Sequence, residues 1–248
     1  MGVLKSLLNK IGDAIFVDFS CMFCGVETVN ESHICPECEK KLIAINGDTC
    51  KKCGAPVSYT EDSCFICFEN KYKFKSHKSC FVYDELSSTP VKLLKYERRR
   101  YLAESMAKVM YAFHKEIFKD VDLITFVPMT YKRYKNRGYN QSYELAKHLS
   151  EISKIKLEKL LIKNNDTQHQ ADLRFEERTK NLKGSFEIVE DYNKIIEGKK
   201  ILLIDDVFTT GSTLHECSRV LLKANAESVI ALTFLKTDPY KNISNLPF

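Results

Sequence analysis

The sequence predicts an α/β fold, an open and mostly parallel sheet with helices on both faces, preceded by a small cysteine-rich module. Apolar segments of strand length alternate with segments whose apolar residues recur at helical spacing, which indicates the sheet. Nine of the ten cysteines precede residue 81, which indicates the module. A chain of 248 residues has room for one domain of about 170 residues plus such a module. We therefore expect two parts, residues 1–76 and residues 77–248.

The expected elements follow from periodicity and from the residues that bound each segment. Helical spacing predicts an amphipathic helix in the first 20 residues and further helices over 89–97, over 102–117 and from about residue 213 onwards. Cys80 opens the first expected strand and Cys217 lies in the last expected helix, so we interpret both as core residues. Strands are expected over residues 81–83, 121–127, 157–162, 185–189, 201–204 and 228–235.

Composition places the chain among ordinary globular proteins. Its hydrophobic content is 44%, and no stretch approaches the roughly 20 apolar residues that a membrane span needs. Charged residues interrupt the apolar positions of the amino terminus, which argues against a signal peptide and favours a cytoplasmic location. The formal net charge of +5 permits an anionic partner without requiring one, because acidic and basic residues are interspersed.

Eight of the cysteines form four Cys-x-x-Cys pairs in two repeats, and adding 29 to each position in the first repeat gives the second. Two such pairs supply the four thiolates of a tetrahedral zinc site with no open position, so each repeat is predicted to be a zinc ribbon with structural zinc. Disulfides and an iron–sulfur cluster are the alternatives, and spacing does not distinguish one zinc per repeat from interleaved ligation. The predicted ligands are Cys21, Cys24, Cys35, Cys38, Cys50, Cys53, Cys64 and Cys67. His33, beside one pair, is interpreted as a surface histidine.

The apolar run 201–204 ends in two carboxylates and then in a turn rich in hydroxyl groups. Four consecutive aliphatic residues suit a strand buried on both faces of a parallel sheet, and ligands collect beyond the carboxyl ends of such strands. The carboxylates can accept hydrogen bonds from ribose hydroxyls or orient a magnesium-bound water, and the turn with the helix that follows can bind phosphate. The predicted sugar-phosphate site consists of Asp205, Asp206, Val207, Phe208, Thr209, Thr210, Gly211, Ser212 and Thr213.

This segment resembles the phosphoribosyl-diphosphate loop of the type I phosphoribosyltransferases, which has an apolar strand, two acids, three variable residues and Thr-Gly-x-Thr. The lysine of a Walker loop and the Gly-x-Gly-x-x-Gly of a dinucleotide site are absent. A strand, turn and helix whose acids only cap the helix is the alternative. In relatives that salvage purines a carboxylate stands where this chain has Thr209, so the resemblance disfavours purine salvage.

A basic segment follows the expected strand 121–127. Lys132, Arg133 and Arg137 could neutralise a diphosphate leaving group together with magnesium. A solvated basic loop is the alternative.

The order of motifs along nearly the whole chain is similar to the ComF family. The motifs are the double ribbon, Lys95-Tyr96, Val-Pro-x-x-x-x-Arg from residue 127, Arg137-Gly-Tyr-Asn-Gln141, Gln170-x-x-Leu173, Arg178-x-x-Asn181-Leu182-x-Gly184-x-Phe186 and the segment 205–213. The resemblance implies a cytosolic phosphoribosyltransferase-like protein that many bacteria use in natural competence, where it acts on incoming single-stranded DNA. The second ribbon is fuller than single-ribbon relatives require.

The densest cationic run of the chain has tyrosines, Tyr96 and Tyr101, interleaved with it. Cations that neutralise the backbone and aromatic rings that stack on bases are the usual means of binding single strands without regard to sequence. A solvated helix end is the alternative. The predicted DNA contacts are Lys92, Lys95, Arg98, Arg99 and Arg100.

Three functions are compatible with these features. The first is a protein that binds phosphoribosyl diphosphate and handles single-stranded DNA during uptake, together with other DNA-uptake proteins. The second is an enzyme that transfers phosphoribose to a nucleophile that the sequence does not identify. The third is a sensor that binds phosphoribosyl diphosphate without turnover.

Overall fold

A computed structural model describes residues 20–28, 33–57, 62–164 and 175–238. The amphipathic helix expected in the first 20 residues and the motif at 170–173 lie outside the described residues, apart from residue 20. The same holds for the side chain of Arg178. Within these ranges, no helix combines the length and the apolar character that crossing a bilayer requires.

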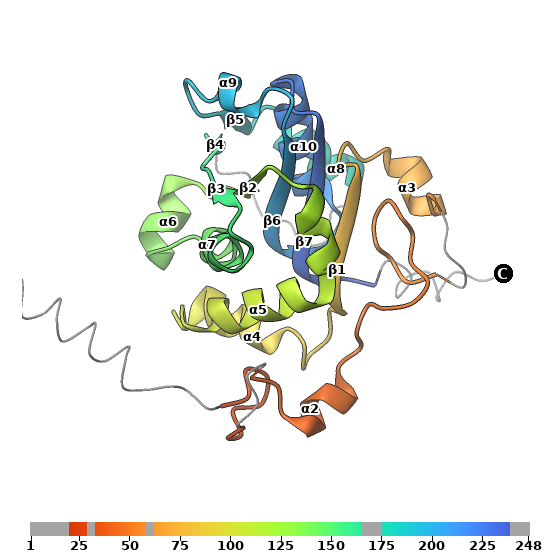
Figure 1. The fold of residues 1–248 in the computed structure, drawn as a ribbon, viewed down its shortest axis with the longest axis vertical. Coiled ribbons are helices and arrows are strands. Elements are labelled where there is room, and N and C mark those ends of the chain that lie inside the picture. Colours follow the sequence, from red (N-terminus) through yellow and green to blue (C-terminus); the bar gives the residue numbers. More distant parts are fainter. Residues whose placement is uncertain (1–19, 29–32, 58–61, 165–174, 239–248) are drawn as a thin grey trace, which may run out of the picture.

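A five-stranded parallel sheet forms the centre of the protein, with the strand order β1-β7-β6-β2-β3 (Figure 1). The two longest strands, β6 (Lys200–Phe208) and β7 (Ser228–Lys236), lie side by side and are almost entirely buried. The uninterrupted apolar run of β6 thus occupies the position that it predicts, between two covered faces. The remaining strands of the sheet are β1 (Ser76–Val82), β2 (Leu123–Phe126) and β3 (Lys156–Leu157).

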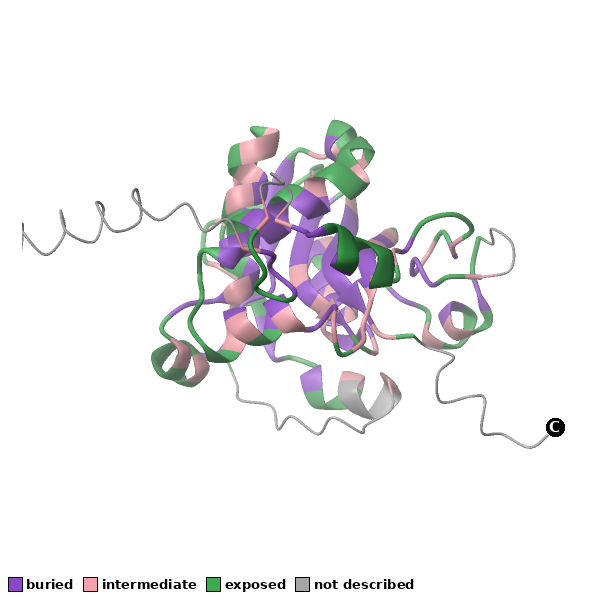
Figure 2. Ribbon diagram, turned by 90° about the horizontal axis from the view of Figure 1, so that it is seen from below, coloured by how far each residue is buried: buried purple, intermediate pink, exposed green. Residues whose placement is uncertain are grey.

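Helices cover both faces of the sheet, and alternate residues of β6 divide between the two. Leu202 and Ile204 pack with α5 (Leu102–His114) and α7 (Gln141–Ser153), whereas Ile201 and Leu203 pack with α10 (Ser212–Lys223). Figure 2 shows the buried residues concentrated in this central sheet and on the inner sides of its helices. The predicted layering is confirmed.

Shorter helices connect or flank these layers. They are α2 (Pro36–Lys41), α3 (Phe65–Asn70), α4 (Thr89–Tyr96), α6 (Tyr131–Arg137), α8 (Phe175–Leu182), α9 (Asn193–Ile196) and the 3₁₀ helix η1 (Lys115–Asp120). The helix expected over 102–117 therefore ends earlier, as α5, and continues as η1.

Two expected strands do not fit the predicted sheet. The segment 157–162 divides into β3 and β4 (Leu161–Lys163), because a tight turn, in which the Leu160 amide donates to the Glu158 carbonyl, swings the chain out of the sheet. The segment 185–189 forms β5 (Phe186–Ile188), which pairs with β4 as a separate antiparallel ribbon. Neither β4 nor β5 belongs to the parallel sheet.

The cysteine repeats contact opposite faces of the sheet. Cys21, Cys35 and Cys38 belong to the apolar cluster of α5 and α7, whereas the second repeat belongs to the cluster of α10. The linker between the repeats lies along the edge strand β1, where Ala44 forms an antiparallel bridge with Phe81. The linker thus covers an edge that would otherwise present unpaired backbone groups.

Candidate functional site

A cavity of about 630 Å³ opens at the carboxyl ends of β2 and β6. Its walls come from the end of α4, from α6, from the start of α7 and from the turn between β6 and α10. Among the described residues, five cationic side chains and two carboxylates line it, a composition that suits an anionic ligand. The cationic residues are Lys95, Arg98, Arg133, Arg137 and Lys163, and the acidic residues are Asp205 and Asp206.

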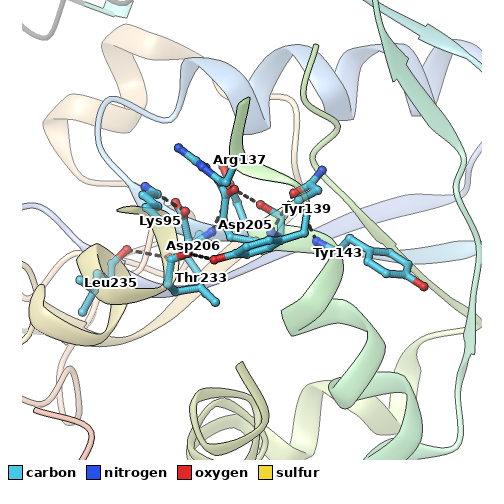
Figure 3. A network of polar contacts seen from close by, with 12 residues as sticks. Lys95, Arg137, Tyr139, Tyr143, Asp205, Asp206, Thr233 and Leu235 are labelled. Atoms are coloured by element: carbon cyan, nitrogen blue, oxygen red, sulfur yellow. Dashed lines mark hydrogen bonds and ion pairs between the residues drawn. The ribbon is translucent and has the colours of Figure 1, made fainter. Parts of the chain in front are cut away.

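The two carboxylates at the end of β6 have separate partners (Figure 3). Asp205 accepts hydrogen bonds through Oδ1 from the Ser142 hydroxyl, at 2.8 Å, and from the backbone amide of Asp206, at 2.9 Å. The Oδ2 atom of Asp206, whose side chain is 6% exposed, lies 2.8 Å from Nζ of Lys95. Three elements, α4, α7 and β6, therefore meet at the acid pair.

Burial, together with the neighbouring charge of Asp206, raises the pKa of Asp205 to about 7, and the hydrogen bond from Ser142 only partly opposes this. Burial alone would lower the pKa of Lys95, but the carboxylates of Asp206 and Asp205 outweigh it and the pKa of Lys95 is raised. Lys95 is therefore a permanent cation beside the pair, whereas Asp205 can gain or lose a proton near neutrality.

The turn after β6 has the geometry of an anion site. Gly211 precedes α10 with a φ of 79° and, as a glycine, offers no capping side chain; of the first amides of the helix, that of Ser212 donates to the Thr210 hydroxyl at 3.5 Å. The hydroxyls of Thr210 and Ser212 lie 2.9 Å apart, and Thr209 and Thr213 line the cavity. The structure thus brings the predicted acids and the predicted turn together at one strand end.

The predicted pyrophosphate residues are divided between the cavity and the surface. Arg133 and Arg137, on α6, line the cavity, whereas Lys132 is exposed and does not line it. The guanidinium of Arg137 donates to the side chain of Gln141 and lies 5.8 Å from the ring centroid of Tyr96. The basic segment is a short helix that forms one wall of the cavity rather than a loop.

The predicted DNA contacts are divided in a similar way. Lys92, Arg98 and Arg99 are exposed, and Arg98 also lines the cavity. Lys95 lines the cavity as well, and its ammonium pairs with Asp206 at the end of β6. Arg100 forms a 2.6 Å ion pair with Glu144, whose side chain is only 5% exposed, so Arg100 compensates a buried charge.

Several residues of the cavity were not predicted as site residues from the sequence. Ser142 holds Asp205, Asn140 caps α7 by accepting from the amides of Ser142 and Tyr143, and Lys163 and Asn181 line the cavity from β4 and α8. Asn140 and Asn181 fall within motifs of the family resemblance, but Ser142 and Lys163 carry no comparable signal.

The eight predicted zinc ligands form two separate clusters, one in each repeat. In each cluster all four sulfur atoms lie within 4.8 Å of one another. The sulfur atoms of Cys24 and Cys35 lie 3.6 Å apart. Those of Cys50 and Cys67 lie 3.8 Å apart, as do those of Cys53 and Cys64. Tetrahedral zinc with bonds of about 2.3 Å requires sulfur separations of about 3.8 Å, whereas a disulfide requires about 2.0 Å.

The sulfur geometry therefore fits structural zinc and excludes both disulfides and interleaved ligation. Backbone amides also support the thiolates at matching positions, from Cys35 to Cys21 at 3.4 Å and from Cys64 to Cys50 at 3.3 Å. His33 is half-buried and belongs to neither cluster. Cys80 and Cys217 are fully buried, as expected of core residues.

Comparison with known proteins identifies the class of each part. Residues 11–69 match the family model of the double zinc ribbon domain, and residues 135–246 match that of the phosphoribosyl transferase domain. The chain therefore combines a double zinc ribbon with a phosphoribosyl transferase domain.

Similar proteins match most of the length of this chain. Competence protein F of Haemophilus influenzae is 27% identical over 86% of this chain and 95% of that protein. Competence protein ComFC of Bacillus subtilis is 26% identical over 84% of this chain and 85% of that protein. DNA utilization protein YhgH of Escherichia coli K12 is 26% identical over 79% of this chain and 87% of that protein. These matches confirm the resemblance to the ComF family.

The raised pKa of Asp205 predicts a particular dependence of stability on pH. A carboxyl that binds its proton more tightly in the folded chain makes folding less favourable as pH rises from about 4, its ordinary pKa, to about 7. Asp205→Asn keeps the oxygen that accepts from Ser142 and removes the titration. Urea unfolding should therefore show that the free energy of unfolding of the variant rises relative to that of wild type between pH 5.5 and 7, by up to about 1.4 kcal/mol per pH unit. Above pH 7 the difference between the two proteins should become constant. A difference that stays constant with pH would contradict the assignment.

Proposed function

We propose that the cavity binds phosphoribosyl diphosphate. The observation that carries this proposal is the meeting, in one cationic cavity, of a carboxylate pair and a hydroxyl-rich turn that leads into a helix N-terminus, both at the end of the same strand. Carboxylates recognise hydroxyl groups and the amides of a helix N-terminus recognise phosphate, so a phosphorylated sugar matches the two together. The cationic side chains of the cavity suit the further negative charge of a diphosphate.

The arrangement suggests an orientation for the ligand. The 5′-phosphate would lie on the turn 209–213, with the ribose hydroxyls toward Asp205 and Asp206. The diphosphate would then face Arg133 and Arg137 on the opposite wall, and magnesium would arrive with it. Because Lys95 already neutralises Asp206, little protein charge remains to hold a magnesium ion directly. We infer that the metal is held mainly by the diphosphate and its waters.

We further propose that the protein handles single-stranded DNA during DNA uptake in the cytoplasm. The names of the relatives, two competence proteins and a DNA utilization protein, support this role. The surface beside the cavity supports it as well. Tyr96 and Tyr101 are 75% and 50% exposed, and they flank the exposed cations Arg98 and Arg99.

The helix α6 extends this surface. Its Tyr131 is 79% exposed and its Lys132 and Lys135 are exposed, and Arg98 reaches α6 by donating to the Asn136 carbonyl at 3.4 Å. Aromatic and cationic side chains therefore continue from the end of α4 onto α6, around the mouth of the cavity.

Transfer of phosphoribose to a nucleophile is the second candidate function, and the phosphoribosyl transferase domain favours it. Pyrophosphate release in the presence of candidate acceptors would distinguish turnover from binding alone.

Ligand binding is tested by calorimetry with phosphoribosyl diphosphate and magnesium. The double variant Asp205→Asn, Asp206→Asn should lose measurable binding, because amides do not provide the charge-assisted bonds to ribose hydroxyls. A matched control is Asp120→Asn with Asp122→Asn, two carboxylates at the opposite end of the strands, near the start of β6. Unchanged affinity in a folded 205/206 variant would remove the proposal.

DNA binding is tested by fluorescence anisotropy with a labelled single strand at several salt concentrations. Lys92, Arg98 and Arg99 should be replaced by alanine and Arg100 retained, because Arg100 compensates the buried Glu144. The variant should bind more weakly on every sequence, and its salt slope should flatten by about 0.7 for each phosphate that it no longer neutralises.

The control replaces Lys194, Lys199 and Lys223, three exposed lysines in or beside α9 and at the end of α10, away from the cavity. A 92/98/99 variant with the wild-type affinity and salt slope would exclude this surface, and wild-type protein that binds no single strand would exclude the DNA role.

A further inference from the structure

The second zinc ribbon lies on the same face of the sheet as the phosphate turn. Its cysteines share an apolar cluster with Phe208, at the end of β6, and with the helix α10 that follows the turn. Tyr72 joins the ribbon to the turn. It comes five residues after the last zinc ligand, Cys67, and is only 5% exposed.

The hydroxyl of Tyr72 is held from both sides. It accepts a hydrogen bond from Nδ2 of Asn70, at 2.8 Å, and donates one to the backbone carbonyl of Thr210, at 2.7 Å. In a planar trans peptide the carbonyl and the next amide point in opposite directions. The bond to the Thr210 carbonyl therefore directs the amide of Gly211 away from the ribbon.

The ring of Tyr72 also fixes the shape of the turn. Its centroid lies 5.9 Å from that of Phe208, edge to face, and 4.8 Å from that of Phe74. A Cβ atom at Gly211 would lie 2.8 Å from Cε1 of Tyr72 and 2.5 Å from Cζ of Phe208. The glycine is therefore required both by its φ of 79° and by the closeness of these two rings.

Other contacts hold the preceding carbonyls of the turn. Thr237, just beyond β7, donates from its amide to the Phe208 carbonyl at 2.9 Å and from its hydroxyl to the Thr209 carbonyl at 3.1 Å. Thr237 thus holds the carbonyls of residues 208 and 209, and Tyr72 holds the carbonyl of residue 210. Tyr72 thus supplies the contact that completes the backbone orientation of the turn.

The first ribbon has no equivalent contact among the described residues. Subtracting the repeat of 29 from Tyr72 gives Ile43, whose side chain is 55% exposed and which lies in the linker beside β1. The first ribbon also packs on the other face of the sheet, with α5. The two repeats share their metal geometry and differ at this position.

We propose that Tyr72 is a positioning residue of the phosphate turn, so that the second zinc ribbon forms part of the ligand site and the first does not. The consequence for ligand affinity rests on the proposed binding of phosphoribosyl diphosphate. The order of the turn in the ligand-free protein does not depend on that ligand.

The test compares Tyr72→Phe, which keeps the ring and removes the hydroxyl, with Ile43→Ala in the first repeat. Amide nuclear magnetic resonance of the ligand-free protein should show larger fast motion at Gly211 in Tyr72→Phe, and unchanged motion there in Ile43→Ala. Calorimetry should show phosphoribosyl diphosphate binding about fivefold more weakly to Tyr72→Phe, the equivalent of one hydrogen bond. Ile43→Ala should bind like wild type, and both variants should retain two zinc ions per chain.

A Gly211 amide with wild-type chemical shift and order in Tyr72→Phe would overturn the proposal. Failure of wild-type protein to bind the ligand would instead remove the proposed function, and the resonance measurement would still decide the role of Tyr72. A fall in thermal stability without a change at Gly211 would show that Tyr72 only supports packing, which also overturns the proposal.

Discussion

Two adjacent carboxylates at the end of the central strand impose the constraint on which the rest of this site depends. Burying charge is costly unless it is paired, so Asp206 requires the ammonium of Lys95, and Asp205 is held by the Ser142 hydroxyl and carries a raised pKa. These partners fix α4 and α7 against the end of β6. The hydroxyl of Tyr139, which donates to the Leu94 carbonyl, anchors α4 next to Lys95. The same contacts that compensate the acids therefore build the walls of the cavity.

The parts of the site that lie in one continuous segment could be predicted from the sequence. The strand, the acid pair and the turn at 201–213 are local, and so are the zinc ligands, because their spacing and the repeat of 29 are visible in the chain. Contacts between distant segments could not be predicted. Lys95 lies in a cationic run that suggests DNA binding. Its ion pair with Asp206 can be seen only in the folded structure. In the same way, the turn at 158–160 that removes β4 from the sheet has no glycine or proline to signal it.

The two ribbons show how a sequence repeat can serve two different structural purposes. Both have four sulfurs at spacings that suit zinc, but their surroundings differ. The first ribbon packs with α5, and the second docks on β1 through His77, whose amide donates to the Lys52 carbonyl and whose ring contacts the Cys53 carbonyl. His77 lies 4.3 Å from Phe208, centroid to centroid, so this docking also supports the end of β6. The difference between the repeats lies in tertiary contacts, which cysteine spacing does not reveal.

We propose that the acid pair and the turn form one site for a phosphorylated, pyrophosphate-bearing ribose. A crystal structure of the protein with phosphoribosyl diphosphate and magnesium tests it most directly. We expect a phosphate on the amides of residues 209–213, ribose hydroxyls on Asp205 and Asp206, and the diphosphate facing Arg133 and Arg137. An empty cavity at saturating ligand would contradict this proposal. So would a ligand bound at another place on the protein, with Lys95 and Asp206 still paired and only solvent in the cavity.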